Sequence, residues 1–294
     1  MIDLGLLVNM KAQKAHTLHG KGDLEQARRL YEEAYQGGLD NPRYLLSYTV
    51  LLFRAGEFEK ACEVLRRTEK VPGINAEQKA QVFVYYASCV FKMGQIDKGI
   101  RLLEKQHLRQ PSGLVYQTLG ILNVEKYDAS QKPDFKALDE EAMKAWETAR
   151  AAALEPAEDA NEDDDEKPSV PDTPPRPSEE VWNEGIEKAK AFLEEAVDYD
   201  DEDPICLDNY AQFLYRVLGD RENARKYFKK AIEIKPTQID TLYFLAQYDI
   251  AEGKPDAAKE KLATAREGRF SPLNYSTPEK VDALLSSISS GKEA

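Results

Sequence analysis

His16 and His19 are the two side chains of this 294-residue chain whose spacing best suits metal ligation. They stand three positions apart, so a helix would place both imidazoles on one face, a spacing that zinc sites use. No third ligand stands near them in the sequence. His107 stands alone beside the expected end of a helix, where a histidine commonly interacts with the last carbonyls. We therefore expect no metal site.

The three cysteines, Cys62, Cys89 and Cys206, form no CxxC pair and no even set, which argues against a disulfide framework and against a zinc ribbon. We expect each thiol to pack as a small apolar group in a reducing compartment. The chain also lacks GxSxG, HExxH and a phosphate-binding glycine loop. The sequence thus predicts neither an enzyme nor a cofactor. An enzyme or metal protein whose site the sequence hides remains the competing class.

The net charge of −13 is concentrated in one segment. Residues 155–180 hold eleven acidic residues against two basic ones, and they are rich in proline. Such a composition buries too little apolar surface to fold, so we expect residues 155–178 to form a flexible, protease-sensitive insertion. Its Pro171–Pro177 stretch has PxxP spacing, which is typical of polyproline ligands and also of linkers. The acidic charge repels phosphates, so we expect no nucleic acid partner.

No run of about 18 apolar residues is present, and the first ten residues lack the basic start of a signal peptide. We therefore expect no direct membrane insertion of the chain as given. The expected location is the cytoplasm, with the soluble part of a membrane-anchored protein as the alternative.

A repeated pattern dominates the rest of the chain: glycine, then alanine five positions later, a large residue after four more, and a small residue after three more. Five segments fit it with few substitutions: Gly22/Ala27/Tyr31/Ala34, Gly56/Ala61/Leu65/Thr68, Gly94/Gly99/Leu103/Gln106, Gly219/Ala224/Phe228/Ala231 and Gly253/Ala258/Leu262/Ala265. Two others carry only its second half, Ala142/Trp146/Ala149 and Ala189/Leu193/Ala196. The apolar residues recur every three or four positions, which indicates helices.

This pattern resembles the tetratricopeptide repeat, a helix-turn-helix unit of 34 residues. The resemblance implies an all-α fold, a right-handed α-solenoid of about six repeats. We expect N-terminal repeats over 1–154, the acidic, proline-rich insertion over 155–178, and C-terminal repeats over 179–294 that end in a capping helix at 276–290. The insertion is expected to replace or displace one helix of the middle repeat.

The resemblance also implies a function. In such proteins the first helix of each repeat lines a concave groove that holds a segment of another protein. The corresponding positions here mix aromatic, aliphatic and basic side chains, which suit peptide binding. They are His16, Arg43, Leu46, Val50, Phe53, Arg54, Gln81, Val84, Ser88, Phe91, Lys92, Gln117, Ile121, Asn209, Phe213, Arg216, Tyr243 and Gln247. For any one of them, simple packing between repeats is an equal alternative.

We therefore predict a non-catalytic scaffold that binds a partner peptide or protein segment. One alternative is an architectural protein that self-associates, for example as a homodimer. Another is a chaperone-associated adaptor. The carboxylate-binding residues of that subfamily do not match here, because the corresponding positions are Ala12, His16, Ser47, Gln81 and Tyr85.

Overall fold

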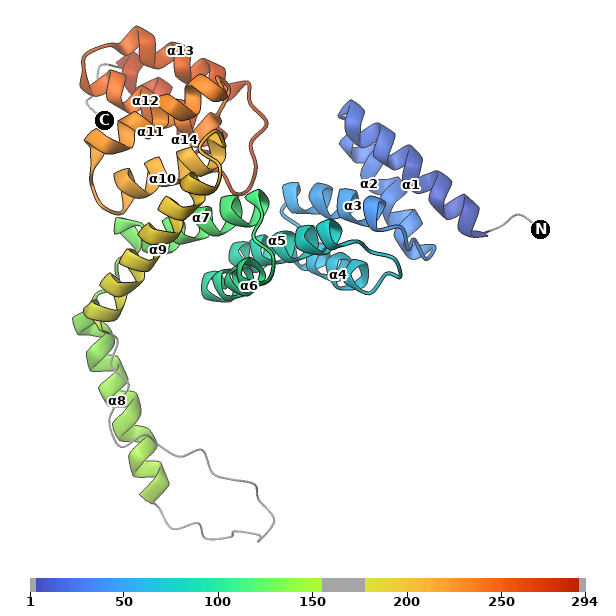
Figure 1. The fold of residues 1–294 in the computed structure, drawn as a ribbon, viewed down its shortest axis with the longest axis horizontal. Helices are drawn as coiled ribbons and strands as arrows, with labels where there is room; N and C mark the ends of the chain where they lie inside the picture. Colours follow the sequence, from blue (N-terminus) through green and yellow to red (C-terminus); the bar gives the residue numbers. More distant parts are fainter. Residues whose placement is uncertain (1–3, 155–177, 291–294) are drawn as a thin grey trace.

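The computed structural model describes residues 4–154 and 178–290. These residues form fourteen α-helices and one 3₁₀ turn, without strands, and the helices stack into a curved array (Figure 1). The all-α solenoid is therefore confirmed. The expected insertion, apart from Ser178, lies outside the described residues. The elements are α1 (Leu4–Lys21), α2 (Leu24–Gln36), α3 (Pro42–Arg54), α4 (Phe58–Glu69), α5 (Ala76–Lys92), α6 (Ile96–Arg109), α7 (Gly113–Tyr127), η1 (Ala129–Gln131), α8 (Phe135–Leu154), α9 (Glu179–Tyr199), α10 (Pro204–Arg216), α11 (Arg221–Ile234), α12 (Ile239–Ala251), α13 (Pro255–Arg266) and α14 (Pro278–Ser290).

Six helix pairs make up the stack. In five of the pairs the two helices are consecutive in the chain. In the remaining pair, the fourth along the stack, α7 packs on α9. The first helices are α1, α3, α5, α7, α10 and α12, and the second helices are α2, α4, α6, α9, α11 and α13. Helix α14 packs against α13 through the fully buried Val281 and so covers the last repeat, as a capping helix does.

The small residues of the repeat pattern lie where helices approach one another. Ala27, Ala61, Ala224 and Ala258 are fully buried in the second helices. A side chain on Gly99 would meet Leu122 and the α5 backbone at about 3 Å, a distance that leaves no room for a methyl group. The large residues four positions later, such as Tyr31 and Phe228, are also fully buried. The predicted repeat register is thus confirmed in these helices.

Turns separate the two helices of a pair, and capping residues mark the start of first helices. Gly56 and Gly253, at such turns, have φ of 78° and 69°, in the left-handed region that glycine adopts without strain. Asn41 and Asp203 cap α3 and α10 by accepting hydrogen bonds from backbone N–H groups of the first turn, and a proline follows each of them at the first helical position. The sequence therefore specifies these helix boundaries locally.

The fourth repeat is interrupted between its two helices. After α7, the chain forms η1 and α8, and α8 extends away from the stack together with the first part of α9 (Figure 1). A 2.6 Å ion pair between Lys132 and Glu179 brings the two ends of the detour together. Helix α8 carries Ala142, Trp146 and Ala149 of the repeat pattern, but it forms no helix pair with another described helix and so does not act as half of a repeat. The detour displaces no helix, because α9 supplies the second helix of the repeat.

Candidate functional site

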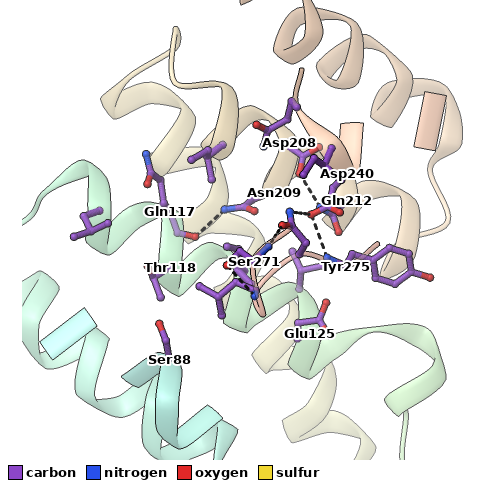
Figure 2. A pocket seen from close by; sticks show the side chains of 18 of the residues that line it. Ser88, Gln117, Thr118, Glu125, Asp208, Asn209, Gln212, Asp240, Ser271 and Tyr275 are labelled. Carbon is purple, nitrogen blue, oxygen red and sulfur yellow. Dashed lines mark hydrogen bonds between the residues drawn. The ribbon is translucent and has the colours of Figure 1, made fainter. Parts of the chain in front are cut away.

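A cavity of about 500 Å³ lies among the first helices (Figure 2). We call it the groove cavity. Its walls come from the end of α3, from α5, α7 and α10, from the connection between α11 and α12 and the start of α12, and from the loop between α13 and α14. Its lining residues include Arg54, Val84, Tyr85, Ser88, Gln117, Thr118, Ile121, Glu125, Asp208, Asn209, Gln212, Arg216, Lys235, Asp240, Arg269, Ser271, Leu273, Asn274 and Tyr275.

All eighteen residues expected to face a partner lie on first helices. The groove cavity brings together seven of them, namely Arg54, Val84, Ser88, Gln117, Ile121, Asn209 and Arg216. The other eleven do not line it: His16, Arg43, Leu46, Val50, Phe53, Gln81, Phe91, Lys92, Phe213, Tyr243 and Gln247. Leu46, Phe53 and Phe213 are buried and pack in the hydrophobic core.

His16 belongs to a polar cluster between the first two repeats. Its Nδ1 lies 3.1 Å from the Ser47 hydroxyl and 3.3 Å from the Tyr31 hydroxyl, and its Nε2 lies 3.3 Å from the Arg43 guanidinium. These contacts join α1, α2 and α3. Their geometry gives the imidazole a role in repeat packing.

Amide side chains connect α7 to α10 across the cavity. The Gln117 amide donates to Asp203, at 2.6 Å. The Asn209 amide donates to the backbone oxygen of Gln117, at 2.8 Å (Figure 2). Asn209 is buried, and a side chain at Gly120 would collide with its amide. The fourth and fifth repeats are therefore fixed to each other at this point of the groove.

Arg216 is the most engaged cation of the cavity. Its guanidinium forms ion pairs with Glu125, at 2.7 Å, and Asp128, at 2.8 Å, and it lies 4.0 Å from the centre of the Tyr275 ring. Only 6% of the side chain is exposed. Because its hydrogen bonds are already used by these partners, Arg216 has a structural role in joining α10 to α7 and to the loop before α14.

Arg54, Lys235 and Arg269 are exposed cations at the cavity, and none forms an ion pair within the described ranges. Lys92, near the same face, is partly buried, and burial lowers the pKa of its ammonium group. Unpaired cations beside a concave surface attract an acidic or polar segment more strongly than a basic one.

Two aspartates lie buried at the C-terminal side of the cavity. Asp208 accepts hydrogen bonds from Thr241 and, at 2.7 Å, from Gln212. Burial and then the negative charge of Asp240 raise the pKa of Asp208 to about 7. Asp240 accepts hydrogen bonds from the side chain of Asn274 and from the backbone N–H groups of Tyr275 and Ser276, at 2.8 to 3.1 Å.

The loop between α13 and α14 contributes lining residues that sequence reasoning missed. The repeat pattern ends at Ala265 and the expected capping helix begins at 276, so residues 266–275 had no assigned position. Two features of the sequence could have indicated this loop: its length and Pro272. The other repeats are joined by shorter turns. Only the folded chain shows that this loop lies over the groove.

Metal-binding and nucleophilic groups do not gather elsewhere in the part of the chain that the structure describes. No group of three or more potential metal ligands is found there. The three cysteines are free and buried. Within residues 4–154 and 178–290, no helix is long and apolar enough to cross a lipid bilayer.

Comparison with known proteins agrees with the repeat pattern. Sequence models described as tetratricopeptide repeat match residues 12–33, 42–67 and 213–238. The fold is similar to the crystal structure of a tetratricopeptide repeat protein from Thermus thermophilus, with a TM-score of 0.54, 16% identity, and coverage of 84% of this chain and 98% of the other. It is also similar to that of PilW, a type IV pilus biogenesis factor, with a TM-score of 0.53, 16% identity, and coverage of 95% and 98%. The search of curated protein sequences finds no significant match.

Proposed function

Because the chain is a tetratricopeptide repeat protein, we propose that it is a non-catalytic scaffold that binds a segment of another protein in its concave groove. The observation that carries this proposal is the groove cavity itself. Residues from five of the six first helices and from the loop before α14 meet around one space of about 500 Å³. Recognition sites for peptides and ligands are concave and mix apolar walls with a few placed polar groups, as this cavity does.

The lining favours a partner segment that is uncharged or carries some acidic groups. Arg54, Lys235 and Arg269 stand exposed at the cavity, while Arg216 is neutralised by Glu125 and Asp128. The Gln117 side-chain oxygen, whose amide nitrogen donates to Asp203, can accept a hydrogen bond from a backbone N–H group of the partner.

A charge reversal at Arg54 tests the proposal. Arg54 is exposed, lies in the last turn of α3 and lines the cavity. Arg109 is the matched control, because it is also an exposed arginine in the last turn of a helix, α6, and does not line the cavity. Partners captured from the native cell by the wild type are identified by mass spectrometry, purified, and titrated against both variants.

We expect Arg54→Glu to weaken binding of a groove partner by at least about tenfold, and Arg109→Glu to leave it unchanged, since one well-placed charge contact contributes about 1.4 kcal/mol or more. Equal affinities of the two variants for every captured partner would contradict the proposal.

A further inference from the structure

The segment Ser271–Tyr275, which we call the groove segment, already occupies part of the concave groove. Ser271, Leu273, Asn274 and Tyr275 line the groove cavity together with residues of α5, α7 and α10. Figure 2 shows Ser271 and Tyr275 beside Asn209, Gln212 and Glu125. A partner in the groove would have to contact these same helices.

The groove segment is a compact turn held by hydrogen bonds within itself. The Asn274 side chain accepts a hydrogen bond from the Ser271 N–H, at 2.7 Å, and the Asn274 N–H donates to the Ser271 carbonyl, at 2.9 Å. The Ser271 hydroxyl also accepts from the Leu273 N–H, at 3.3 Å. The turn therefore presents the Leu273 side chain without needing the groove to hold its backbone in shape.

The tip of the turn reaches the other half of the array. Leu273 packs against the hydrophobic cluster formed by α1 to α5, whose members include Phe53, Leu52 and Cys89. These residues precede Leu273 by more than 180 positions. The groove segment thus crosses from the C-terminal repeats to the N-terminal ones, as a bound segment of another protein would.

The base of the turn is held by polar and aromatic contacts. Asp240 accepts hydrogen bonds from Asn274, Tyr275 and Ser276. The Tyr275 ring stacks on Phe244, with 5.1 Å between ring centres, and Arg216 covers it. Ser276 forms two hydrogen bonds to Asp240, from its N–H and its hydroxyl, and both lie outside the groove segment.

We propose that the groove segment is an intramolecular ligand, which a turn-forming segment of a partner protein displaces. The partner segment places an aliphatic side chain in the position of Leu273 and, two residues later, an aromatic side chain in the position of Tyr275. This inference rests on the function proposed above. A tethered ligand has an effective concentration of roughly millimolar, so it raises the concentration of partner needed for binding.

The experiment uses the chain's own sequence as the probe. A fluorescein-labelled peptide of residues 268–277 is titrated, by fluorescence anisotropy, with the wild type and with a full-length variant whose residues 271–275 are replaced by Gly-Ser-Gly-Ser-Gly. The variant keeps Ser276 and Asp240. Circular dichroism melting establishes that it is folded.

We expect the variant to bind the peptide at least about tenfold more tightly than the wild type, because the wild-type groove is already occupied. Peptides with Leu273→Ser or Tyr275→Ser should bind the variant at least about tenfold more weakly than the native peptide. Equal affinities of wild type and variant, or no binding to the folded variant up to 1 mM protein, would overturn the inference.

A second variant decides the matter if the replacement prevents folding. Full-length Leu273→Ser keeps the Asp240 bonds and loses only the contact of the tip, so it should bind the native peptide more tightly than the wild type does. Unchanged affinity would overturn the inference. The Arg54→Glu test uses captured partners and not this peptide, so the two proposals can fail separately. If a captured partner depends on Arg54 but the 268–277 peptide does not bind, the intramolecular ligand is refuted and the scaffold function is retained.

Discussion

Ala258 shows how a single small side chain fixes the geometry of a repeat. It is fully buried in α13 and packs in a cluster with Ala246 of α12 and Val281 of α14. We expect Ala258→Leu to lower the free energy of unfolding by about 1–3 kcal/mol, because the added atoms force close-packed helices apart. Chemical denaturation measures the change.

The matched control lies on the same helix. Ala263 of α13 is exposed, so Ala263→Leu should change the free energy of unfolding by less than about 0.5 kcal/mol. If both variants unfold like the wild type, Ala258 is not at a helix contact.

The burial of Asp208 predicts that stability depends on pH. Burial and the charge of Asp240 raise its pKa to about 7 in the folded protein, whereas the unfolded carboxyl titrates near about 3.9. The folded state then binds more protons than the unfolded state between about pH 4 and pH 7. This group therefore stabilises the fold at low pH, and its contribution is lost as the pH rises through that window.

Asp208→Asn removes the titration and keeps an acceptor for Thr241, at the cost of the hydrogen bond from Gln212. We expect it to be more stable than the wild type at pH 8 by roughly 1 kcal/mol or more, with a smaller difference at pH 5. Melting curves at several pH values measure this. Glu222→Gln, at a carboxylate with 90% of its side chain exposed, is the control and should follow the wild-type profile. An Asp208→Asn profile parallel to that of the wild type would rule out the linkage.

At the scale of elements, α8 is an addition to the fourth repeat. Helix α7 packs on α9 and α10, and the Lys132–Glu179 ion pair closes the detour at its base. We expect replacement of residues 134–177 by a short Gly-Ser linker to leave the array folded, with the melting temperature changed by no more than about 4 °C, which corresponds to about 1–2 kcal/mol for a chain of this size. Circular dichroism should show only the loss of α8.

Helix α9 offers the contrast to this excision. Leu193 is fully buried between α9 and its neighbours, so Leu193→Ala should cost about 2–5 kcal/mol of stability. If the chain without residues 134–177 unfolds or aggregates while Leu193→Ala stays stable, then α8 and not α9 completes the repeat.

At the scale of the whole molecule, the N-terminal end of the array exposes apolar side chains. Leu6 and Met10 of α1 are 58% and 57% exposed, and Leu7 beside them is 40% exposed. An exposed apolar patch at the end of a helix stack favours association with a second surface. We expect light scattering of the wild type at high concentration to give the mass of a dimer, and Leu6→Lys/Met10→Lys to give that of a monomer.

Val181→Lys, at a valine of α9 that is 65% exposed, is the control and should leave the mass unchanged. A wild type that stays monomeric at about 100 µM, where even a weak dimer with a micromolar Kd would form, would contradict the expected self-association.

Helix pairs, turns and repeat register could be predicted from the sequence because local chemistry fixes them. Small residues such as Ala27 and Ala61 mark the close helix contacts, and glycines such as Gly56 mark the left-handed turns. Each signal spans fewer than 15 residues, so one sequence contains it in full. The identification of first helices as the groove lining follows from the same register.

Contacts between residues far apart in the chain were decided only by the tertiary structure. The pairing of α7 with α9 could not be predicted from local sequence, because 51 residues separate these two helices of one repeat. In addition, α8 carries the residue pattern of a second helix. The burial of Phe213 and the engagement of Arg216 by Glu125 and Asp128 depend on how neighbouring repeats stack. The crossing of the groove by Leu273 depends on the curvature of the whole array, which is the sum of small rotations between repeats and is specified by no single segment.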